Sequence, residues 1–369
     1  MTTKKASQNS VITEMTPPAA DADERLAYLA LAITPGIGAR KMAELLASSP
    51  TIHAAVPAGG ASLAAAARVL QQCDRAGATV LVPPDAAFPA RLRSIPGAPL
   101  CLFVRGDLSL VTRPCVAIVG SRDHTTYGRD AARMMAAAAA SAGVVVVSGM
   151  ARGLDAVAHH AVLDAGGTTI GVLGNGLGVI YPAQNRVLYE RVERDGLLLT
   201  EHVPGERPHA GAFQRRNRLI SGLADVLVVI EAAKGSGTMG TVAAALEQGR
   251  DVMAVPGPIT SPTSAGTNQL LRDGAEPLLH PDDLVAKFTK LPARAVAEAG
   301  PVDPPPCTLS AEEAQVFSAL TAAPRHVDEL ALATGLPVGT LLGVLCGLEL
   351  GGLAEQQSGS LFRRLPRAW

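Results

Sequence analysis

Glycine, arginine and hydroxyl side chains recur directly after short apolar runs of this chain. The first such cluster is Gly120-Ser121-Arg122, the second runs from Ser148 to Gly153 and contains Arg152, and a later one is Gly235-Ser236-Gly237-Thr238. Backbone N–H groups in glycine-rich turns bind anions, and a nearby guanidinium adds charge-assisted hydrogen bonds. These segments therefore predict a site for phosphate oxygens, although simple turn geometry remains an alternative for each glycine loop.

The densest positive charge lies in Phe213-Gln214-Arg215-Arg216-Asn217-Arg218, at the start of an expected helix. No acidic residue is closer in the sequence than Glu206 or Asp225, so the guanidiniums repel one another unless anions or solvent screen them. A solvated basic helix face is the alternative. We favour phosphate contact because the segment falls at the binding end of the expected sheet.

Other chemistries find little support. Gly235 to Gly240 fits G-x-G-x-x-G, but the motif follows the fifth strand instead of the first, which argues against a dinucleotide site. No G-x-S-x-G elbow, P-loop Lys-Ser/Thr or metal-spaced histidine set is present, and the five cysteines are scattered. We expect His159 and His160 to be structural, and we predict no catalytic residue, metal or cofactor.

Short β-branched runs alternate with helical stretches between Ala78 and Leu279. We expect strands at 115–119, 144–148, 168–173, 197–200, 226–230 and 252–255, and helices near 127–142, 153–165, 183–194, 213–222 and 238–248. Two earlier strands, near 79–82 and 100–104, would extend the sheet at an edge. This pattern predicts an α/β fold with a Rossmann-like, doubly wound and mainly parallel sheet, whose ligands lie at the carboxyl ends of the strands.

The flanking segments predict further units. Residues 1–23 are polar and are expected to form a disordered tail, and residues 24–76 a small helical domain of the helix-hairpin-helix or SAM-like type around Thr34 to Gly38. The Rossmann-like domain is expected at 78–290, a Pro-rich linker at 291–307 and a winged helix at 308–369. For the Thr34 to Gly38 turn, DNA backbone binding and plain helix packing are equally open.

The expected recognition helix of the winged helix, 338–350, contains Glu349 and no Lys or Arg. A helix that enters a major groove normally carries basic and amide side chains. We therefore predict a protein-contact or auxiliary role for this domain, whose basic edge is limited to Arg363, Arg364 and Arg367.

Composition narrows the function classes. The chain has 369 residues, with 32 Lys plus Arg against 33 Asp plus Glu, so any nucleic-acid site must be local. The N-terminal segment has no apolar h-region, and the most apolar stretch, 134–147, is interrupted by Ser141 and Gly143. We expect a cytoplasmic protein that does not contact membranes.

Several motifs occur in the order typical of one family. They are Val116 to Arg122, Ser148-Gly149-x-Ala151-Arg152-Gly153-x-Asp155-x-x-Ala158-His159, Tyr181-Pro182-x-x-Asn185, Phe213-x-x-Arg216-Asn217-Arg218-x-Ile220-x-Gly222, and Glu247-x-Gly249-Arg250-x-Val252-x-Ala254-Val255-Pro256-Gly257. Over about 78–280 the chain resembles the DprA/Smf family. The resemblance implies a non-enzymatic protein of natural transformation that binds incoming single-stranded DNA, forms a homodimer and helps to load RecA.

Carried over residue by residue, the resemblance places Arg122, Arg152, Arg216, Asn217 and Arg218 along a DNA groove. The chain departs from the family at 236–241, where Ser-Gly-Thr-Met-Gly-Thr replaces the usual Ser-Gly-Ser-Leu-Ile-Thr, and at Gln214, which replaces proline. Small hydroxyls and backbone donors remain, so we expect phosphate binding to survive, whereas the shape of the pocket is open.

Aromatic residues make up only 3% of the chain, and Tyr127, Tyr181 and Phe213 are the ones near these loops. We therefore expect backbone-directed binding with little sequence preference and a clear salt dependence, and weaker binding to duplex DNA if any. The rival function is a nucleoside-monophosphate phosphoribohydrolase, which would need Glu201 or Glu231 as its carboxylate. A nucleotide-sensing regulator that binds duplex DNA is disfavoured because the recognition helix contains no Lys or Arg.

Overall fold

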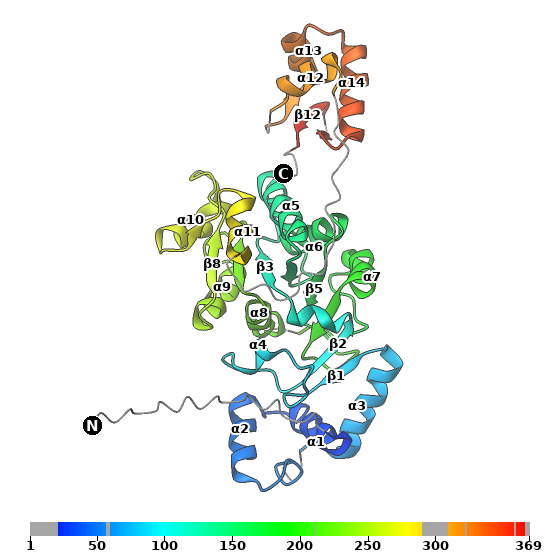
Figure 1. Ribbon diagram of the computed structural model, residues 1–369, viewed down its shortest axis with the longest axis vertical. Helices are drawn as coiled ribbons and strands as arrows, with labels where there is room; N and C mark the ends of the chain where they lie inside the picture. The colour runs from blue at the N-terminus through cyan, green and yellow to red at the C-terminus, as the bar shows by residue number, and fades with distance from the viewer. Residues whose placement is uncertain are drawn as a thin grey trace, which may run out of the picture.

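The computed structural model describes residues 21–56, 60–209, 211–289, 309–321, 323–357 and 359–365. Three parts are visible in Figure 1: a helical part that contains the first three helices, a central sheet covered by helices, and a small C-terminal part. Residues 1–20 of the expected tail and the expected linker at 291–307 lie outside the described residues. The tail was expected to extend to residue 23, which is wrong, because Asp21 caps the first helix and Ala22 and Asp23 belong to it.

A mostly parallel sheet forms the centre of the molecule. Within the described residues it has nine strands in the order β1-β2-β6-β5-β4-β3-β7-β8-β9. The strands are β1 (Thr79–Leu81), β2 (Leu102–Gly106), β3 (Cys115–Val119), β4 (Val145–Ser148), β5 (Thr169–Val172), β6 (Leu197–Thr200), β7 (Val226–Val229), β8 (Asp251–Ala254) and β9 (Glu276–Pro277). Strands β2 and β1 are antiparallel and extend one edge, while all other neighbours pair in parallel.

Helices cover both faces of the sheet. They are α4 (Ala90–Arg93), α5 (Thr126–Ser141), α6 (Leu154–Asp164), α7 (Arg186–Asp195), α8 (Ala212–Leu223), α9 (Thr238–Glu247), α10 (Ala265–Arg272) and α11 (Pro281–Thr289), with short 3-10 turns at Leu108–Thr112, Ala183–Asn185 and Pro262–Ser264. The inner strands β3 to β7 are buried along their whole length, which is why their sequences are continuous apolar runs. The predicted α/β class, the doubly wound sheet and the two edge strands are confirmed.

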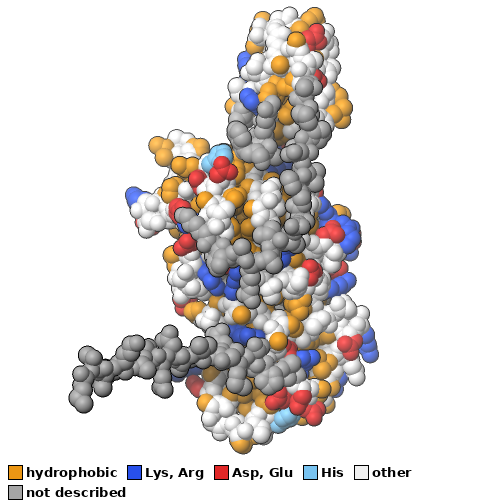
Figure 2. Space-filling view, in the orientation of Figure 1, with side chains coloured by type: hydrophobic (Ala, Val, Ile, Leu, Met, Phe, Trp, Pro, Cys, Tyr) orange, Lys and Arg blue, Asp and Glu red, His pale blue; other side chains and the backbone are white. Residues whose placement is uncertain are grey.

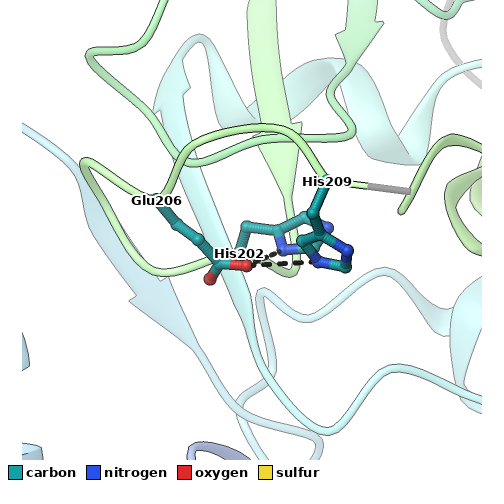
Figure 3. A group of neighbouring side chains, drawn as sticks. All are labelled: His202, Glu206 and His209. Carbon is teal, nitrogen blue, oxygen red and sulfur yellow. Dashed lines mark hydrogen bonds and ion pairs between the residues drawn. The ribbon is translucent and has the colours of Figure 1, made fainter. Parts of the chain in front are cut away.

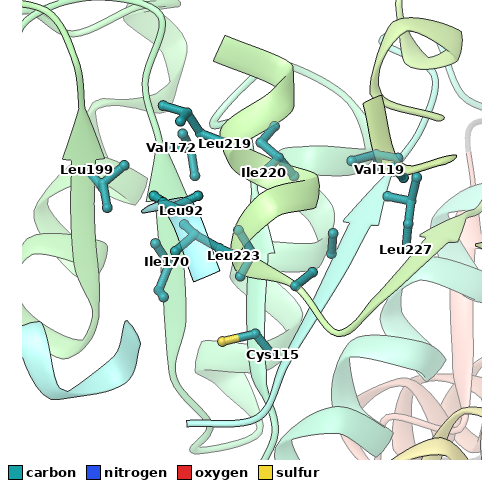
Figure 4. Close-up of a cluster of buried hydrophobic side chains, with 14 of the residues drawn as sticks. Leu92, Cys115, Val119, Ile170, Val172, Leu199, Leu219, Ile220, Leu223 and Leu227 are labelled. Atoms are coloured by element: carbon teal, nitrogen blue, oxygen red, sulfur yellow. The ribbon is translucent and has the colours of Figure 1, made fainter. Parts of the chain in front are cut away.

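Alternate residues of each strand enter different cores. Helices α8 and α9 pack on one face, and α5 and α6 on the other. On the first face, Leu219, Ile220 and Leu223 of α8 lie among strand residues such as Val119 and Val172 (Figure 4). Because these three side chains fix the helix against the sheet, they also fix where its first turn, with Arg215 to Arg218, lies.

The N-terminal helices are α1 (Ala22–Ala32), α2 (Ala39–Ser48) and α3 (Leu63–Ala76). Helix α3 packs its buried face, including Val69 and Cys73, beside Val80 and Phe103 of the antiparallel edge. The turn from Thr34 to Gly38 joins α1 to α2, as expected, and Gly36 has a positive φ of 83° that favours glycine.

The C-terminal part contains α12 (Ala311–Ala319), α13 (Val327–Thr334), α14 (Val338–Leu350), β10 (Arg325–His326), β11 (Ala354–Gln357) and β12 (Leu361–Arg364). The predicted three helices and the hairpin are present. Strand β10 was not predicted; it pairs with β12 to give a three-stranded sheet within the described residues. Its core gathers Val316, Leu330, Leu341 and Phe362.

The hairpin contacts helix α5 through an ion-pair network. Arg363 is 1% exposed and binds both Asp130 of α5 and Glu355 of β11, with Nη2 2.9 Å from Asp130 Oδ1. Arg129 of α5 in turn lies 2.7 Å from Glu355. Arg363, which was predicted to belong to the basic edge of this domain, thus forms ion pairs within the chain.

In the part of the chain that the structure describes, no single helix is long and apolar enough to cross a membrane. Together, the two helices Val327–Thr334 and Val338–Leu350 are long and apolar enough for a membrane span, by length and composition only, but the pair is bent by 105°. On the face shown in Figure 2, Lys and Arg side chains are interspersed with Asp and Glu, in keeping with the net charge of −1.

Candidate nucleic-acid interface

The loops at the carboxyl edge of the sheet enclose a cleft of about 440 Å³. Its walls come from the loops after β3, β4 and β7 and from the first turns of α8 and α9. The predicted residues that line it are Gly120, Ser121, Arg122, Phe213, Arg216, Asn217, Ser236, Gly237 and Thr238. Segments separated by more than 100 residues in the chain therefore meet at one site.

Two glycines permit the close approach of these loops. A Cβ atom at Gly149 would lie 1.8 Å from Nη1 of Arg216, so only glycine leaves room for that guanidinium. Gly153 has a φ of +84°, and a Cβ there would meet the backbone of Ser121 and Arg122 at about 2.5 Å. Gly153 thus lets the backbone of Ser121 and Arg122 pack against it, and it does not line the cleft itself.

Arg216 is the buried floor of the cleft. It is 4% exposed, and its Nη1 donates to the carbonyl of Val172 at 2.9 Å. Burial lowers the pKa of the Arg216 guanidinium and raises the pKa of the nearby Asp155 carboxylate, while the opposite charge of each partner opposes the other's shift. Asp155 accepts a hydrogen bond from the Gly149 N–H at 3.0 Å. Arg216 is therefore held mainly by the protein, a role that the sequence analysis did not assign to it.

Arg218 is paired with an acid. Its Nη2 lies 2.7 and 2.8 Å from the two carboxylate oxygens of Glu201, at the end of β6. The expectation that only anions or solvent screen these arginines is wrong, because the fold brings Glu201 beside Arg218 and Asp155 near Arg216. The linear sequence hides both partners, since neither is adjacent to the arginine run.

A second hollow, of about 400 Å³, adjoins this edge. It is lined by Glu201, His202, Glu206, Arg215, Arg216 and Arg218, and by Ile37 and Gly38 of the N-terminal turn. The turn at 34–38, whose role was left open, thus faces the arginine segment.

The exposed cations are the ones available to a ligand. Among the described carboxylates none pairs with Arg122, which is exposed and lies with its Cζ 6.0 Å from the ring centre of Phe213. Arg215 is also exposed, and its Nη2 lies 3.3 Å from Nε2 of His209. Arg152 pairs with Asp123 at 2.8 Å, but both side chains are largely in solvent, so the pair is weak and easily exchanged.

An aromatic pair lies beside Arg122. The rings of Tyr181 and Phe213 have centroids 5.3 Å apart and an interplanar angle of 34°, and Tyr181 is 47% exposed. A small pocket of about 80 Å³ lies here, lined by both rings, Arg122 and Arg152. Tyr127, by contrast, donates its hydroxyl to the carbonyl of Pro256 at 2.6 Å.

The glycine loop after β7 forms the opposite wall. Thr238 Oγ1 donates to the carbonyl of Gly120 at 3.2 Å, and Asn217 Nδ2 lies 3.4 Å from the carbonyl of Gly237. The Ser236 hydroxyl is buried and has no hydrogen-bond partner in the described residues. Gly235 has a φ of +76° with open space around it, so its glycine serves the turn.

Neither carboxylate of the rival enzyme is free to act in the cleft. Glu231 is 1% exposed and accepts hydrogen bonds from the Thr125 backbone at 2.9 Å and from the Thr125 hydroxyl. Glu201 is held by Arg218. Of the two histidines expected to be structural, His159 is fully buried with Nδ1 2.7 Å from Thr169 Oγ1, and burial lowers its pKa to about 3.

Comparison with known proteins identifies the family of the chain. Residues 79–289 match the family model described as DNA recombination-mediator protein A, and residues 300–360 match the DprA winged helix domain. A Mycobacterium tuberculosis protein named "Putative DNA processing protein DprA" is 39% identical over 311 residues, which cover 80% of this chain and 79% of that protein. Protein Smf of Escherichia coli is 42% identical over 207 residues, covering 56% of this chain and 55% of that protein.

Two solved structures are also similar. The X-ray structure of DNA processing protein A from Streptococcus pneumoniae has a TM-score of 0.61 and 31% identity, and covers 72% of this chain and 98% of that one. A structure of the Helicobacter pylori protein, described for its single-stranded DNA binding mode, has a TM-score of 0.53 and 29% identity, and covers 58% and 96%. The chain thus belongs to the family of DNA recombination-mediator protein A, DprA.

Proposed function

We propose that this protein binds single-stranded DNA at the carboxyl edge of its sheet, mainly through the phosphate backbone. The observation that carries the proposal is the position of Arg122, an exposed guanidinium without a described acidic partner, which lines both the cleft and the small pocket at the Tyr181–Phe213 pair. A single strand of DNA can place its phosphates in the cleft and stack a base on the aromatic pair.

In the proposed complex, Arg122 and Arg215 supply the exchangeable positive charge. Backbone N–H groups of Gly237 and Thr238 at the start of α9 and the Asn217 amide add neutral donors, while a base stacks at the exposed ring of Tyr181. Arg216 and Arg218 do not contact the strand in this complex. Their contacts with Val172 and Glu201 fix the part of α8 that carries Arg215. A single strand as the ligand is supported by the similar Helicobacter pylori protein, whose structure is described for single-stranded DNA binding.

Backbone contact predicts little sequence preference and an affinity that falls with salt. For single strands the slope of log affinity against log salt is about −0.7 per neutralised phosphate. Duplex DNA presents paired bases that cannot reach the aromatic pair, so we expect it to bind more weakly.

The wider role that we propose follows the family: the protein acts in the cytoplasm without catalysing a reaction, protects incoming strands during natural transformation and helps to load RecA as a homodimer. The winged helix would serve protein contact. Its exposed apolar side chains, Leu332, Val338, Leu342 and Leu350, support this role, as does the absence of Lys and Arg from α14.

The test is fluorescence anisotropy of a labelled single strand and its duplex with the full chain and with an Arg122→Ala, Arg215→Ala variant. We expect a preference for the single strand and an affinity about ten- to a hundredfold lower in the variant, as befits two lost phosphate contacts. Arg194→Ala, Arg272→Ala removes the same charge before β6 and β9, at the amino edge of the sheet, and should bind like the wild type. Equal losses in the two variants would contradict the proposal.

A further inference from the structure

Three potential metal ligands converge in the loop between β6 and α8. Nδ1 of His202 lies 2.7 Å from Oε1 of Glu206, and Nε2 of His209 lies 3.6 Å from the same oxygen. Figure 3 shows the Glu206 carboxylate directed at both imidazole rings. One ligand atom from each residue lies within 4.8 Å of the other two. The expectation of no metal-spaced histidine set therefore does not hold in three dimensions.

The ligand set is that of a zinc ion. Two imidazoles and one carboxylate bind Zn²⁺ with a fourth position open, whereas Ca²⁺ and Mg²⁺ prefer oxygen ligands alone. Ligand atoms roughly 2.0–2.2 Å from a tetrahedral ion lie about 3.3–3.6 Å from one another. The distance between His209 and Glu206 already fits this value, and the distance between His202 and Glu206 fits once an ion replaces the shared proton.

The loop holds its ligands in place before any ion binds. The His202 N–H donates to the buried hydroxyl of Thr200 at 3.0 Å. The Gly205 N–H donates to the Leu177 carbonyl, and the Glu206 carbonyl accepts from Gly176, both at 2.9 Å. Gly205 has a φ of +83°, so the turn that presents Glu206 depends on glycine. Preorganisation of this kind lowers the entropic cost of binding.

We propose that His202, Glu206 and His209 form a zinc site that is coupled to Arg215. Because a guanidinium only donates, Nε2 of His209 must accept the 3.3 Å hydrogen bond from Arg215. A zinc ion bound at that lone pair removes the acceptor and repels the guanidinium. Arg215 is then released towards the strand, while the ion adds positive charge to a hollow that His202 and Glu206 already line.

The site itself is tested without DNA. Zn²⁺ alone is titrated into the tag-free full chain against a chromophoric chelator, and Co²⁺ replaces it to report four-coordinate geometry by visible absorption. We expect one ion per chain. Losing outer-shell partners already costs about 10–100-fold in metal affinity, so His209→Asn and Glu206→Gln should each cost at least tenfold. His53→Asn removes another exposed imidazole and should bind zinc like the wild type.

Thermal melting separates loss of the site from loss of the fold. Zinc should raise the Tm of the wild type and of His53→Asn but not that of His209→Asn, whose Tm without metal should match the wild type. Binding that is weak and non-stoichiometric in the wild type, or unchanged in both ligand variants, would overturn the site.

The coupling to Arg215 rests on the proposed function and has its own measurement. Zinc should tighten single-strand binding of the wild type several-fold and that of the Arg215→Ala variant clearly less, because only the charge of the ion acts in the variant. Stoichiometric zinc binding with no effect on DNA affinity would overturn the coupling. Equal tightening in both proteins would also overturn the coupling. Failure of DNA binding both with and without zinc would instead count against the proposed function, because the metal titration does not involve DNA.

Discussion

Arginines at the carboxyl edge of the sheet and arginines of the C-terminal hairpin look alike in the sequence but have opposite surroundings in the fold. At the sheet edge, Arg122 and Arg215 are exposed and form no ion pair with a described carboxylate. In the hairpin, Arg363 is buried between Asp130 and Glu355, and Arg364 lies with its Cζ 4.0 Å from the ring centre of Phe317.

The difference lies in what each guanidinium would have to give up to reach a phosphate. Arg122 gives up only a loose contact with a ring, whereas Arg363 would leave the buried Asp130 carboxylate without its main cation and Glu355 with Arg129 alone. The arginines of the sheet edge also differ among themselves. Arg216 and Arg218 resemble Arg363, because contacts within the protein already hold them. The number of arginines in a segment is thus a poor guide to binding until their acidic neighbours are known.

The largest effect that would sharpen this comparison is expected at Arg216. Arg216→Met leaves Asp155 buried without its nearby cation and should lower the free energy of unfolding by about 3 kcal/mol. Urea denaturation followed by circular dichroism measures the change. Adding Asp155→Asn should recover part of the loss. A single variant as stable as the wild type would show that Arg216 is not committed to the fold.

Next in size is the contact between the hairpin and α5. Arg363→Met removes the main cation beside the buried Asp130 carboxylate, so we expect the C-terminal part to separate from α5 and return Asp130 to water, at a smaller cost than that of Arg216→Met. Small-angle X-ray scattering should show a larger radius of gyration. An unchanged radius with unchanged stability would mean that the network contributes nothing. Lys287→Met removes a cation from a largely solvated ion pair on α11 and should leave the radius unchanged.

Removing the whole C-terminal part, including the hairpin, should affect DNA binding little. A chain that ends before residue 308 keeps Arg122, Arg215 and the cleft, so its single-strand affinity should stay within about twofold of the full chain. Anisotropy measures it. A loss as large as that of Arg122→Ala, Arg215→Ala would break the comparison, because it would place essential contacts in the C-terminal part.

The smallest effect is expected at Arg364. Its stacking on Phe317 should contribute about 0.5–1 kcal/mol to the stability of the C-terminal part, as cation–π pairs do at exposed sites. Arg364→Leu keeps the aliphatic packing and should lower the Tm slightly, while single-strand affinity remains unchanged. A marked loss of affinity in this variant would make Arg364 a DNA contact.

Much of the fold was predictable because its signals are local. A strand buried on both faces must be a continuous apolar run, and the runs at 115–119 and 197–200 match β3 and β6 at both ends. The order of the strands was not predictable, since it depends on pairings between distant segments. The two-residue strands β9 and β10 are too short to carry a pattern.

The site was predictable to the extent that it consists of loops after strands. Gly120 to Arg122 and Ser236 to Thr238 reach the same cleft because parallel strands end at one edge. The pairing of Arg218 with Glu201, the burial of Arg216 and the convergence of His202 with His209 arise from tertiary packing. No spacing rule in the sequence indicates them.

The most direct test of the central claim is the salt dependence of single-strand binding in two matched double variants. Arg122→Ala, Arg215→Ala and Arg363→Ala, Arg364→Ala each remove two guanidiniums from the full chain. We predict that the first makes the slope of log affinity against log salt shallower by about 1.4 and that the second leaves it unchanged. A shallower slope in the second variant, or no change in the first, would contradict the account.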